Sequence, residues 1–191
     1  MYTIENIENT IIVNKSKFIA NIFSIDNIDE IDTYIKKIKN KYKDATHHCY
    51  AYIFDNIKRF NDDNEPSGTA GIPILECLEK NNLNHILCIV TRYFGGIKLG
   101  AGGLVRAYTS ATAQAIENSN KLEIIHGYNC DIKFDYSKID EINKILDKYE
   151  ILSKDFGNIV IYNVNIDEEV LNSLKNFNII VKKEIVIKRK P

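Results

Sequence analysis

Residues 91–108 read Thr-Arg-Tyr-Phe-Gly-Gly-Ile-Lys-Leu-Gly-Ala-Gly-Gly-Leu-Val-Arg-Ala-Tyr, a glycine-rich segment that joins a predicted strand to a predicted helix. The apolar run at residues 85–90 indicates a buried strand, and the apolar spacing after residue 103 indicates a helix that continues to about Asn118. Five glycines within nine residues leave the backbone free to reach positive φ and to expose its N–H groups. A strand, a glycine-rich turn and a helix start together form an arrangement that binds anions.

Charge around this segment favours the same interpretation. No Asp or Glu occurs from Lys80 to Ile116, although the whole chain has 26 acidic residues. Acids normally occupy the first turn of a helix, because they complement the positive end of its dipole, but here the first turn carries Arg106. The alternative is that the glycines only allow close helix packing and that the cations are solvated. We predict an anion site.

Two common nucleotide-binding motifs do not match the segment. Gly95 and Gly100 have the separation of a P-loop, but Ala101 and Gly102 stand where that motif requires Lys followed by Ser or Thr. Residues 100–105 end in valine, and no ribose-binding acid follows at the distance that a dinucleotide-binding fingerprint requires. The segment therefore belongs to neither class.

The predicted anion site combines cations, backbone amides and one aromatic ring. It comprises Arg92, Tyr93, Lys98, Gly100, Gly102, Gly103 and Arg106. Tyr93 is the candidate for stacking on a base, because Tyr108 falls on the apolar stripe of the predicted helix and is expected in the core.

A second set of polar residues is predicted to support this site. It comprises His47, Asp62, Asp63, Glu65, Ser67 and Thr69. These residues either contact the ligand or fold against the glycine-rich segment and position Arg92 or Lys98. His47 and His48 are adjacent on a predicted strand, so they point to opposite faces. The acids and an imidazole could ligate a metal, but their spacing is not diagnostic, and we predict neither a metal nor a cofactor.

Periodicity predicts the remaining elements. In the first half we expect a hairpin or bent strand over 10–25, a helix through 28–38 capped by Asp26 or Asn27, a strand at 47–54, a polar loop at 55–69 and a helix at 73–80. In the second half Ser137 and Asp140 resemble a capping box, and Asp167 can cap a second helix. The order β-α-β-β-α-β over residues 122–191 is that of a ferredoxin-like sandwich.

Composition excludes several classes of protein. A formal net charge of −1 gives no global basic field, so nucleic-acid binding would depend on a local patch. The four cysteines never form a Cys-x-x-Cys pair, which favours reduced thiols over disulfides or zinc. No basic leader, apolar run or membrane-spanning stretch is present in the sequence, so we expect a cytoplasmic protein without a membrane partner.

The glycine-rich segment also carries a family resemblance. Residues 62–73 (Asp-Asp-Asn-Glu-Pro-Ser-Gly-Thr-Ala-Gly-Ile-Pro), followed by 91–104, resemble the signature of the IMPACT family in its bacterial YigZ-like branch. Residues 45–52 and 16–20 match as well. Asn64 departs from the glycine that is usual in the family, but Asn also tolerates a left-handed turn.

This resemblance implies a two-domain α+β fold and a role in translation. The first domain, residues 1–120, would have the ribosomal-protein domain 2-like fold of domain IV of elongation factor G, and the second, residues 121–191, would be ferredoxin-like. Eukaryotic members regulate translation by interfering with activation of a kinase that phosphorylates an initiation factor, partly through an extra domain that these 191 residues lack.

Two hypotheses about function follow. The first is a non-catalytic RNA- or ribosome-associated protein that regulates translation and binds phosphate groups through residues 91–106. The second is an enzyme that acts on a phosphorylated small molecule in the same pocket, with His47 or His48 and Asp63 or Glu65 in proton transfer. No nucleophile motif supports catalysis, so we favour the first. The oligomeric state, the RNA target and the role of the second domain are left open.

Overall fold

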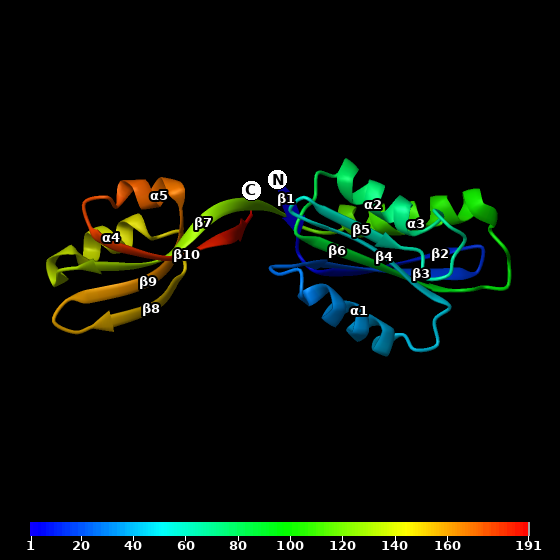
Figure 1. Cartoon of the computed structure of the whole chain (residues 1–191), viewed down its shortest axis with the longest axis horizontal. Coiled ribbons are helices and arrows are strands. Elements are labelled where there is room, and N and C mark those ends of the chain that lie inside the picture. Colours follow the sequence, from blue (N-terminus) through cyan, green and yellow to red (C-terminus); the bar gives the residue numbers. More distant parts are fainter. Residues whose placement is uncertain (191) are drawn as a thin grey trace. The chain divides into compact units, whose positions relative to one another are not determined.

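The computed structural model describes residues 1–190, which divide into two compact units. Unit 1 contains Met1–Leu122 together with Lys190, and unit 2 contains Glu123–Arg189. Both units combine strands and helices, so the chain is a mixed α+β protein with two sheets (Figure 1).

Unit 1 has one antiparallel sheet with helices on both faces. Its elements are β1 (Tyr2–Ile4), β2 (Ile7–Val13), β3 (Ser16–Ser24), α1 (Glu30–Lys41), β4 (His47–Phe54), β5 (Ile57–Asn61), α2 (Gly71–Lys80), β6 (Ile86–Tyr93) and α3 (Gly100–Glu117). The strand order of the sheet is β2-β3-β6-β4-β5. Its central strand β6 pairs with β3 on one side and with β4 on the other.

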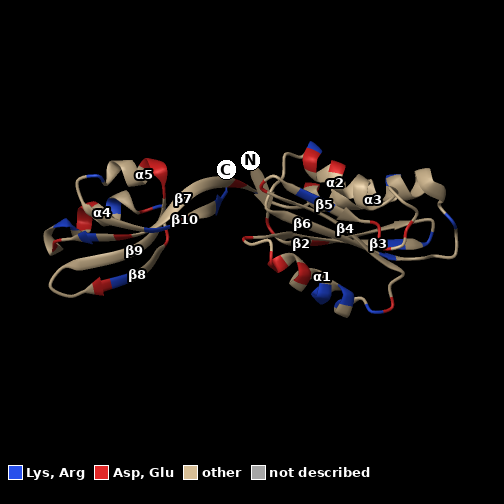
Figure 2. Ribbon diagram, in the orientation of Figure 1, with Lys and Arg blue, Asp and Glu red and all other residues tan. Residues whose placement is uncertain are grey.

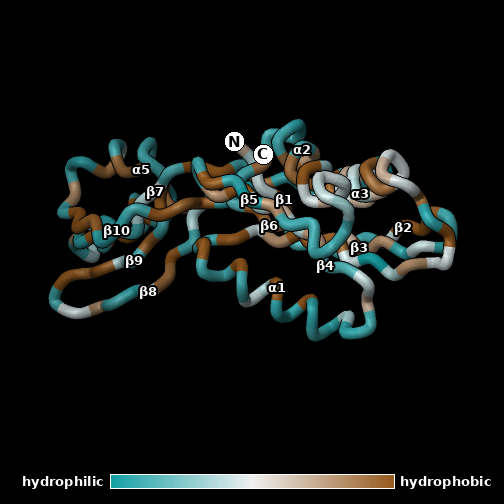
Figure 3. Tube along the Cα trace, turned by 45° about the vertical axis from the view of Figure 1, so that its right-hand side comes forward, coloured by the Kyte–Doolittle hydropathy of each residue, from teal (hydrophilic) through white to brown (hydrophobic). Residues whose placement is uncertain are grey.

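Two apolar clusters cover the two faces of this sheet. On one face, α2 and α3 pack against the buried side chains of β3, β4 and β6, and Tyr108 of α3 is fully buried there. On the other face, Ile31 and Ile38 of α1 pack against Leu87 and Ile89 of β6. Figure 1 shows α1 on the opposite side of the sheet from α2 and α3. In Figure 3 α1 is mostly teal with short brown stretches, as expected for an amphipathic surface helix.

Unit 2 is a smaller antiparallel sheet with two short α-helices. Its elements are β7 (Lys121–Phe134), the 3₁₀ turn η1 (Tyr136–Lys138), α4 (Ile139–Ile145), β8 (Ile151–Phe156), β9 (Val160–Asp167), α5 (Glu168–Ser173) and β10 (Asn178–Arg189). The strand order is β10-β7-β9-β8. The core includes Ile142 of α4 and Leu174 beside α5, packed against inward side chains of β7 and β9 such as Ile132 and Val164.

Most predicted elements of unit 1 are confirmed, with one error. The hairpin is formed by β2 and β3, and strand β4 has the predicted bounds. The polar loop predicted for residues 55–69 is wrong in its first part, because Ile57–Asn61 form the edge strand β5. All five residues of β5 are exposed, so its sequence shows no apolar alternation.

Helix capping was predicted correctly at two of three sites. The Asp167 carboxylate accepts a hydrogen bond from Val170 N at 3.0 Å and caps α5. The capping box predicted for Ser137 and Asp140 is wrong, because α4 begins at Ile139 without a side-chain cap. Before α1, Asn27 Oδ1 accepts a hydrogen bond from Asp29 N at 3.0 Å and Glu30 Oε1 accepts one from Asn27 N at 2.9 Å, so Asn27 caps the helix start as predicted.

At Gly95 the glycine-rich segment passes very close to the backbone of the β2–β3 turn. A Cβ atom at this position would lie 2.1 Å from the carbonyl carbon of Lys15 and 2.2 Å from its oxygen. We expect Gly95→Ala to lower the free energy of unfolding by about 3 kcal/mol, because two backbones would have to separate.

Gly157→Ala is the control for Gly95→Ala, since its nearest neighbour would be the Ile159 carbonyl oxygen at 3.9 Å. This control should change stability by less than about 0.5 kcal/mol. Urea unfolding followed by circular dichroism measures both variants. Equal stability of Gly95→Ala and the parent would contradict the close approach.

Candidate functional site

The glycine-rich segment leaves the sheet at Tyr93 and enters α3 at Gly100. Its first two amides have partners within the protein: Phe94 N donates to Thr46 Oγ1 at 3.1 Å, and Gly95 N donates to Ser16 Oγ at 3.1 Å. Gly96 and Gly100 adopt φ of +83° and +69°, which L side chains rarely adopt. The segment is therefore anchored at its start and turns sharply before the helix.

The N-terminus of α3 is uncapped. Leu99 occupies the capping position without a side-chain hydrogen bond, and the first turn contains no acid. A Cβ at Gly103 would lie 3.0 Å from Leu99 Cβ, a tight contact that would require Leu99 to shift. At Gly102 the nearest atom to a Cβ would be Arg106 Nη1 at 3.5 Å, which is ordinary contact. The backbone at Gly102 is therefore open to solvent on its outer side.

Two predicted cations lie at the surface beside this helix start. Lys98 precedes it and Arg106 folds back toward Gly102, and both are exposed. Lys17 of β3 lies on the other face of the sheet, with Nζ 4.8 Å from the centre of the Tyr93 ring. Figure 2 shows blue segments on α3 and on the loop before it.

Arg92 lies elsewhere than the sequence suggests. It is the penultimate residue of β6 rather than part of the loop, and only 5% of it is exposed. Its Nη1 donates to Glu65 Oε1 at 2.6 Å, and its guanidinium lies 5.5 Å from the Phe18 ring and 5.6 Å from the Phe94 ring. An anion at Arg92 would therefore compete with a buried carboxylate.

The residues predicted to support the site make different contacts in the structure. Asp62 accepts hydrogen bonds from the backbone amides of Gly68, Ala70 and Gly71 at 2.9, 3.1 and 2.7 Å. It thereby neutralises the N-terminus of α2 from outside the helix. Thr69 Oγ1 donates to the Pro66 carbonyl oxygen at 2.6 Å, and so closes the turn rather than capping α2. Ser67 is exposed.

The two histidines of β4 lie on opposite faces of the sheet, as their adjacency predicts. His47 is opposite Arg92 in the strand register and faces α3, whereas His48 is opposite Thr91 and bonds its hydroxyl at 3.1 Å. Asp63 contacts both: its carbonyl oxygen accepts from His47 Nδ1 at 2.7 Å, and its carboxylate accepts from His48 N at 2.6 Å. Burial lowers the pKa of His48. Asn64 follows with φ of +68°, the left-handed conformation expected for this residue.

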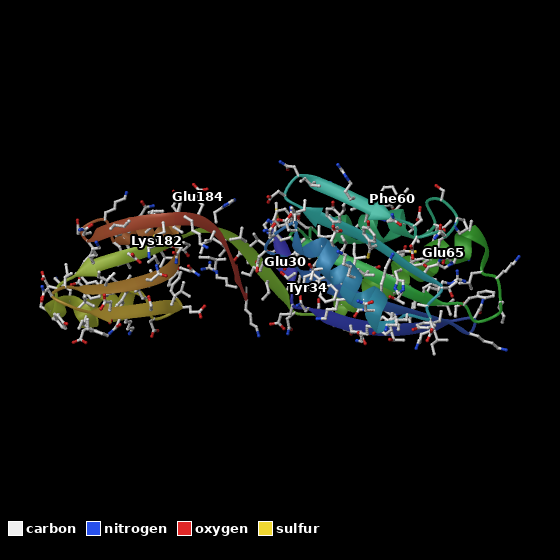
Figure 4. The ribbon with its side chains drawn as sticks, turned by 60° about the horizontal axis from the view of Figure 1, so that its bottom comes forward. Glu30, Tyr34, Phe60, Glu65, Lys182 and Glu184 are labelled. Carbon is white, nitrogen blue, oxygen red and sulfur yellow. The ribbon has the colours of Figure 1, made fainter. Side chains whose placement is uncertain are left out.

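A pocket of about 370 Å³ opens between these segments. Its lining residues are Thr46, His47, Glu65, Pro66, Arg92, Phe94, Lys98, Leu99, Gly100, Ala101 and Leu104. Figure 4 places Glu65 beside the ribbons of β6 and α3. The predicted residues His47, Glu65, Arg92, Lys98 and Gly100 meet here, whereas Tyr93, Gly102, Gly103 and Arg106 do not line the pocket.

The sequence-based prediction missed the apolar wall of the pocket. Phe94 is 48% exposed and lies next to Tyr93, which had been preferred for stacking. The available signal was strand alternation: because Arg92 points to the α3 face, Tyr93 points to the other face of the sheet. The sequence does not indicate that Leu99 and Pro66 line a pocket, because single apolar residues in loops are common.

Two ionisable side chains beside the pocket, Cys49 and Tyr108, are protonated at neutral pH. Cys49 Sγ donates to Tyr108 OH at 3.3 Å, and Tyr108 OH donates to Glu65 Oε1 at 2.8 Å. Burial raises the pKa of the Cys49 thiol and of the Tyr108 phenol, so both stay protonated at neutral pH. All four cysteines are buried and free.

Among residues 1–190, no group of three or more His, Cys, Asp or Glu side chains is arranged to hold a metal ion. Within the same residues, none of the helices has the length and apolar character needed to span a bilayer.

Asp62 offers a test of the loop that shapes the pocket. We expect Asp62→Asn to lower the free energy of unfolding by about 2 kcal/mol, because it removes a charge that accepts three amides at the start of α2. Asp44→Asn, at an exposed acid between α1 and β4, is the control and should be neutral. Thermal unfolding measures both, and equal melting temperatures would refute the capping role.

Comparison with known proteins gives consistent matches. The Impact N-terminal domain family matches residues 14–116. The chain is 37% identical over 179 residues to IMPACT family member YvyE of Bacillus subtilis (strain 168), covering 90% of this chain and 78% of the relative. It is 38% identical over 109 residues to IMPACT family member YigZ of Escherichia coli (strain K12), covering 54% of this chain and 53% of that protein.

A crystal structure of a hypothetical protein matches with a TM-score of 0.63 and 25% sequence identity, covering 95% of this chain and 97% of that one. The family match spans more than half of the chain, and the glycine-rich segment and the loop at 62–69 both lie inside it. The chain therefore belongs to the IMPACT family.

Proposed function

We propose that this protein is a non-catalytic RNA- or ribosome-associated module that regulates translation, and that it binds phosphate groups at the start of α3. The observation that carries the proposal is an uncapped, acid-free helix N-terminus with Lys98 and Arg106 beside it. Such a helix end presents unpaired N–H groups and a positive dipole, to which a phosphate binds favourably.

Gly102 supports the proposal independently of charge. Neither sterics nor backbone conformation requires glycine at this position, and glycine inside a helix costs about 1 kcal/mol relative to alanine. A missing side chain lets a ligand approach the first helical amides. Arg92, which was predicted as a phosphate ligand, is assigned instead to hold Glu65 in place.

Two aromatic residues, Phe94 and Tyr93, are available to stack on the bases of an RNA strand. Phe94 is half exposed at the mouth of the pocket, next to the helix start. Tyr93 lies on the other face of the sheet with Lys17 over its ring. Bases stack on such rings in single-stranded RNA, so the proposed ligand is an unpaired strand rather than a duplex.

The assignment to translation rests on membership of the IMPACT family. The proposed fold names agree with it: unit 1 as a ribosomal-protein domain 2-like fold, and unit 2 as a ferredoxin-like sandwich. The strand order β10-β7-β9-β8 of unit 2 and its β-α-β-β-α-β sequence support the second name.

One observation favours the alternative of a small-molecule enzyme. His47 Nε2 lies 3.8 Å from Glu65 Oε2, and both residues line the pocket. This pair could transfer a proton to or from a phosphorylated substrate bound at the same helix start. Thermal-shift screening with phosphorylated metabolites tests it, since a ligand at 100 times its Kd raises stability by about 2.7 kcal/mol.

Salt dependence tests the phosphate contacts. Binding of a short single-stranded RNA, followed by fluorescence anisotropy, should weaken steeply as salt rises. The double variant Lys98→Ala with Arg106→Ala should flatten the log–log slope by about 1.4, because each cation neutralises one phosphate and each such contact contributes about 0.7 for a single strand.

Lys36→Ala with Lys37→Ala is the matched control, since it removes the same charge from an exposed face of α1 in the same unit. Its slope should equal that of the parent. An unchanged slope in the Lys98 and Arg106 variant, or a parent that binds neither RNA nor sedimenting ribosomes, would refute the proposal.

Gly102→Ala separates binding from folding. Alanine should raise the free energy of unfolding by about 0.5–1 kcal/mol, because it replaces glycine in a helix without a clash. RNA affinity should nevertheless fall several-fold, since the new methyl group faces the bound phosphate. Urea unfolding and anisotropy measure the two effects, and a variant that is stabilised with full affinity would argue against contact at this backbone.

A further inference from the structure

The floor of the pocket holds a carboxylate whose two oxygens are in different situations. Glu65 is only 8% exposed, and its Oε1 accepts from both Arg92 Nη1 at 2.6 Å and Tyr108 OH at 2.8 Å. Oε2 accepts no hydrogen bond from the described residues 1–190, and it lies 3.8 Å from His47 Nε2. It is not one of the fully buried oxygens that lack a partner, so it is open to the pocket and free to accept a hydrogen bond from a ligand.

His47 provides a second acceptor beside it. Nδ1 lies 2.7 Å from the carbonyl oxygen of Asp63, which can only accept, so Nδ1 carries a hydrogen. In the neutral ring Nε2 is then a lone-pair acceptor directed toward the pocket. Two acceptors, Glu65 Oε2 and His47 Nε2, therefore lie side by side at the floor.

The walls and the rim have different chemistry. Phe94, Leu99, Leu104 and Pro66 form apolar walls, and the rim carries Lys98 with the uncapped start of α3. A ligand that fits has paired N–H donors at one end, a flat apolar body and an anion at the other end. A strongly hydrated ammonium ion fits the walls poorly.

We propose that this pocket binds a guanine base, with N1–H donating to Glu65 Oε2, the 2-amino group donating to His47 Nε2, and the attached phosphate at the start of α3. The proposal rests on the proposed function and specifies its ligand, since the guanine can belong to a single-stranded RNA or to a free nucleotide. A volume of about 370 Å³ is near the lower end of the range of small-molecule sites, as a single nucleotide requires.

Hydrogen-bonding pattern separates guanine from the other bases. Guanine alone presents two adjacent donors, N1–H and N2–H₂, on its Watson–Crick edge. Adenine and cytosine each place an amino donor next to an acceptor nitrogen, and uracil places a single donor between two carbonyl acceptors. An acceptor facing Glu65 Oε2 or His47 Nε2 would leave lone pairs opposed, and each well-formed base pairing of this kind contributes about 1–3 kcal/mol of discrimination.

Base analogues on the unmodified protein provide the first test. Three fluorescent RNA pentamers are compared by anisotropy, each with adenine at four positions and with guanine, inosine or adenine at the centre. Inosine lacks only the 2-amino group. We expect about tenfold weaker binding for inosine and weaker binding still for adenine. Equal affinity for all three would overturn the guanine proposal.

A variant at His47 extends the test to the protein side. His47→Ala removes the partner of the 2-amino group, so this variant should bind the guanine and inosine pentamers with equal affinity. His126→Ala, at an exposed histidine of β7, should keep the tenfold difference. A His47→Ala variant that still prefers guanine tenfold would overturn the assignment of that contact.

Glu65→Gln requires a second readout, because it also removes the negative charge that pairs with a buried arginine. Where circular dichroism shows the parent fold, its guanine preference should fall about tenfold or more; where it shows unfolding, the pentamers on the parent protein decide. Competition by free GMP and by IMP shows whether the base is recognised without RNA.

The outcomes distinguish the two proposals. Steep salt dependence with no base preference keeps RNA binding and rejects the guanine pocket. Failure of all pentamers to bind, together with binding of GMP over IMP, rejects RNA as the ligand and keeps the pocket. Failure of the pentamers and of GMP alike rejects both.

Discussion

The ion pair between Glu65 and Arg92 holds the site together. Both side chains are more than nine-tenths buried, and Tyr108 OH donates to the same carboxylate oxygen that receives the arginine. Three segments far apart in the sequence, namely the loop at 62–69, the end of β6 and the middle of α3, are joined through one oxygen atom. Desolvation makes such a pair costly to assemble, and removal of one partner alone costs about 3–5 kcal/mol because a buried charge is left unpaired.

Two helices on the same face of the sheet, α2 and α3, have N-termini with opposite electrostatic surroundings. Asp62 places a carboxylate against the start of α2, where three amides bond it. The start of α3 receives no acid and no cap, and it has Lys98 and Arg106 nearby. Each helix end carries about half a positive charge, so the internal acid cancels the potential at α2 and the cations increase it at α3. The positive potential is therefore cancelled at the start of α2 and left uncancelled at the start of α3.

Sequence patterns predicted what depends on local spacing and missed what depends on distant contacts. The positions of β4, α2 and α3 followed from apolar periodicity, and the turn at Asn64 followed from the tolerance of asparagine for positive φ. Edge strand β5 was missed because all its residues are exposed, so its pairing with β4 left no apolar alternation in the sequence. Arg92 was predicted to bind the anion, with the alternative that the acidic loop positions it; the structure agrees with the alternative, because Glu65, 27 positions away, pairs with Arg92.

Glu65 contributes both to the ion pair that holds the fold and to the lining of the pocket. One oxygen is committed to Arg92 and Tyr108, and the other is open to the pocket without a donor from the protein. A ligand that donates to this second oxygen would therefore leave the ion pair with Arg92 undisturbed. Polar recognition at such a floor also discriminates more strongly than apolar contact, because a base with an acceptor in the wrong place leaves buried groups unpaired. In the proposed site the second oxygen of Glu65 would thus supply a preference among bases that the apolar walls could not supply themselves.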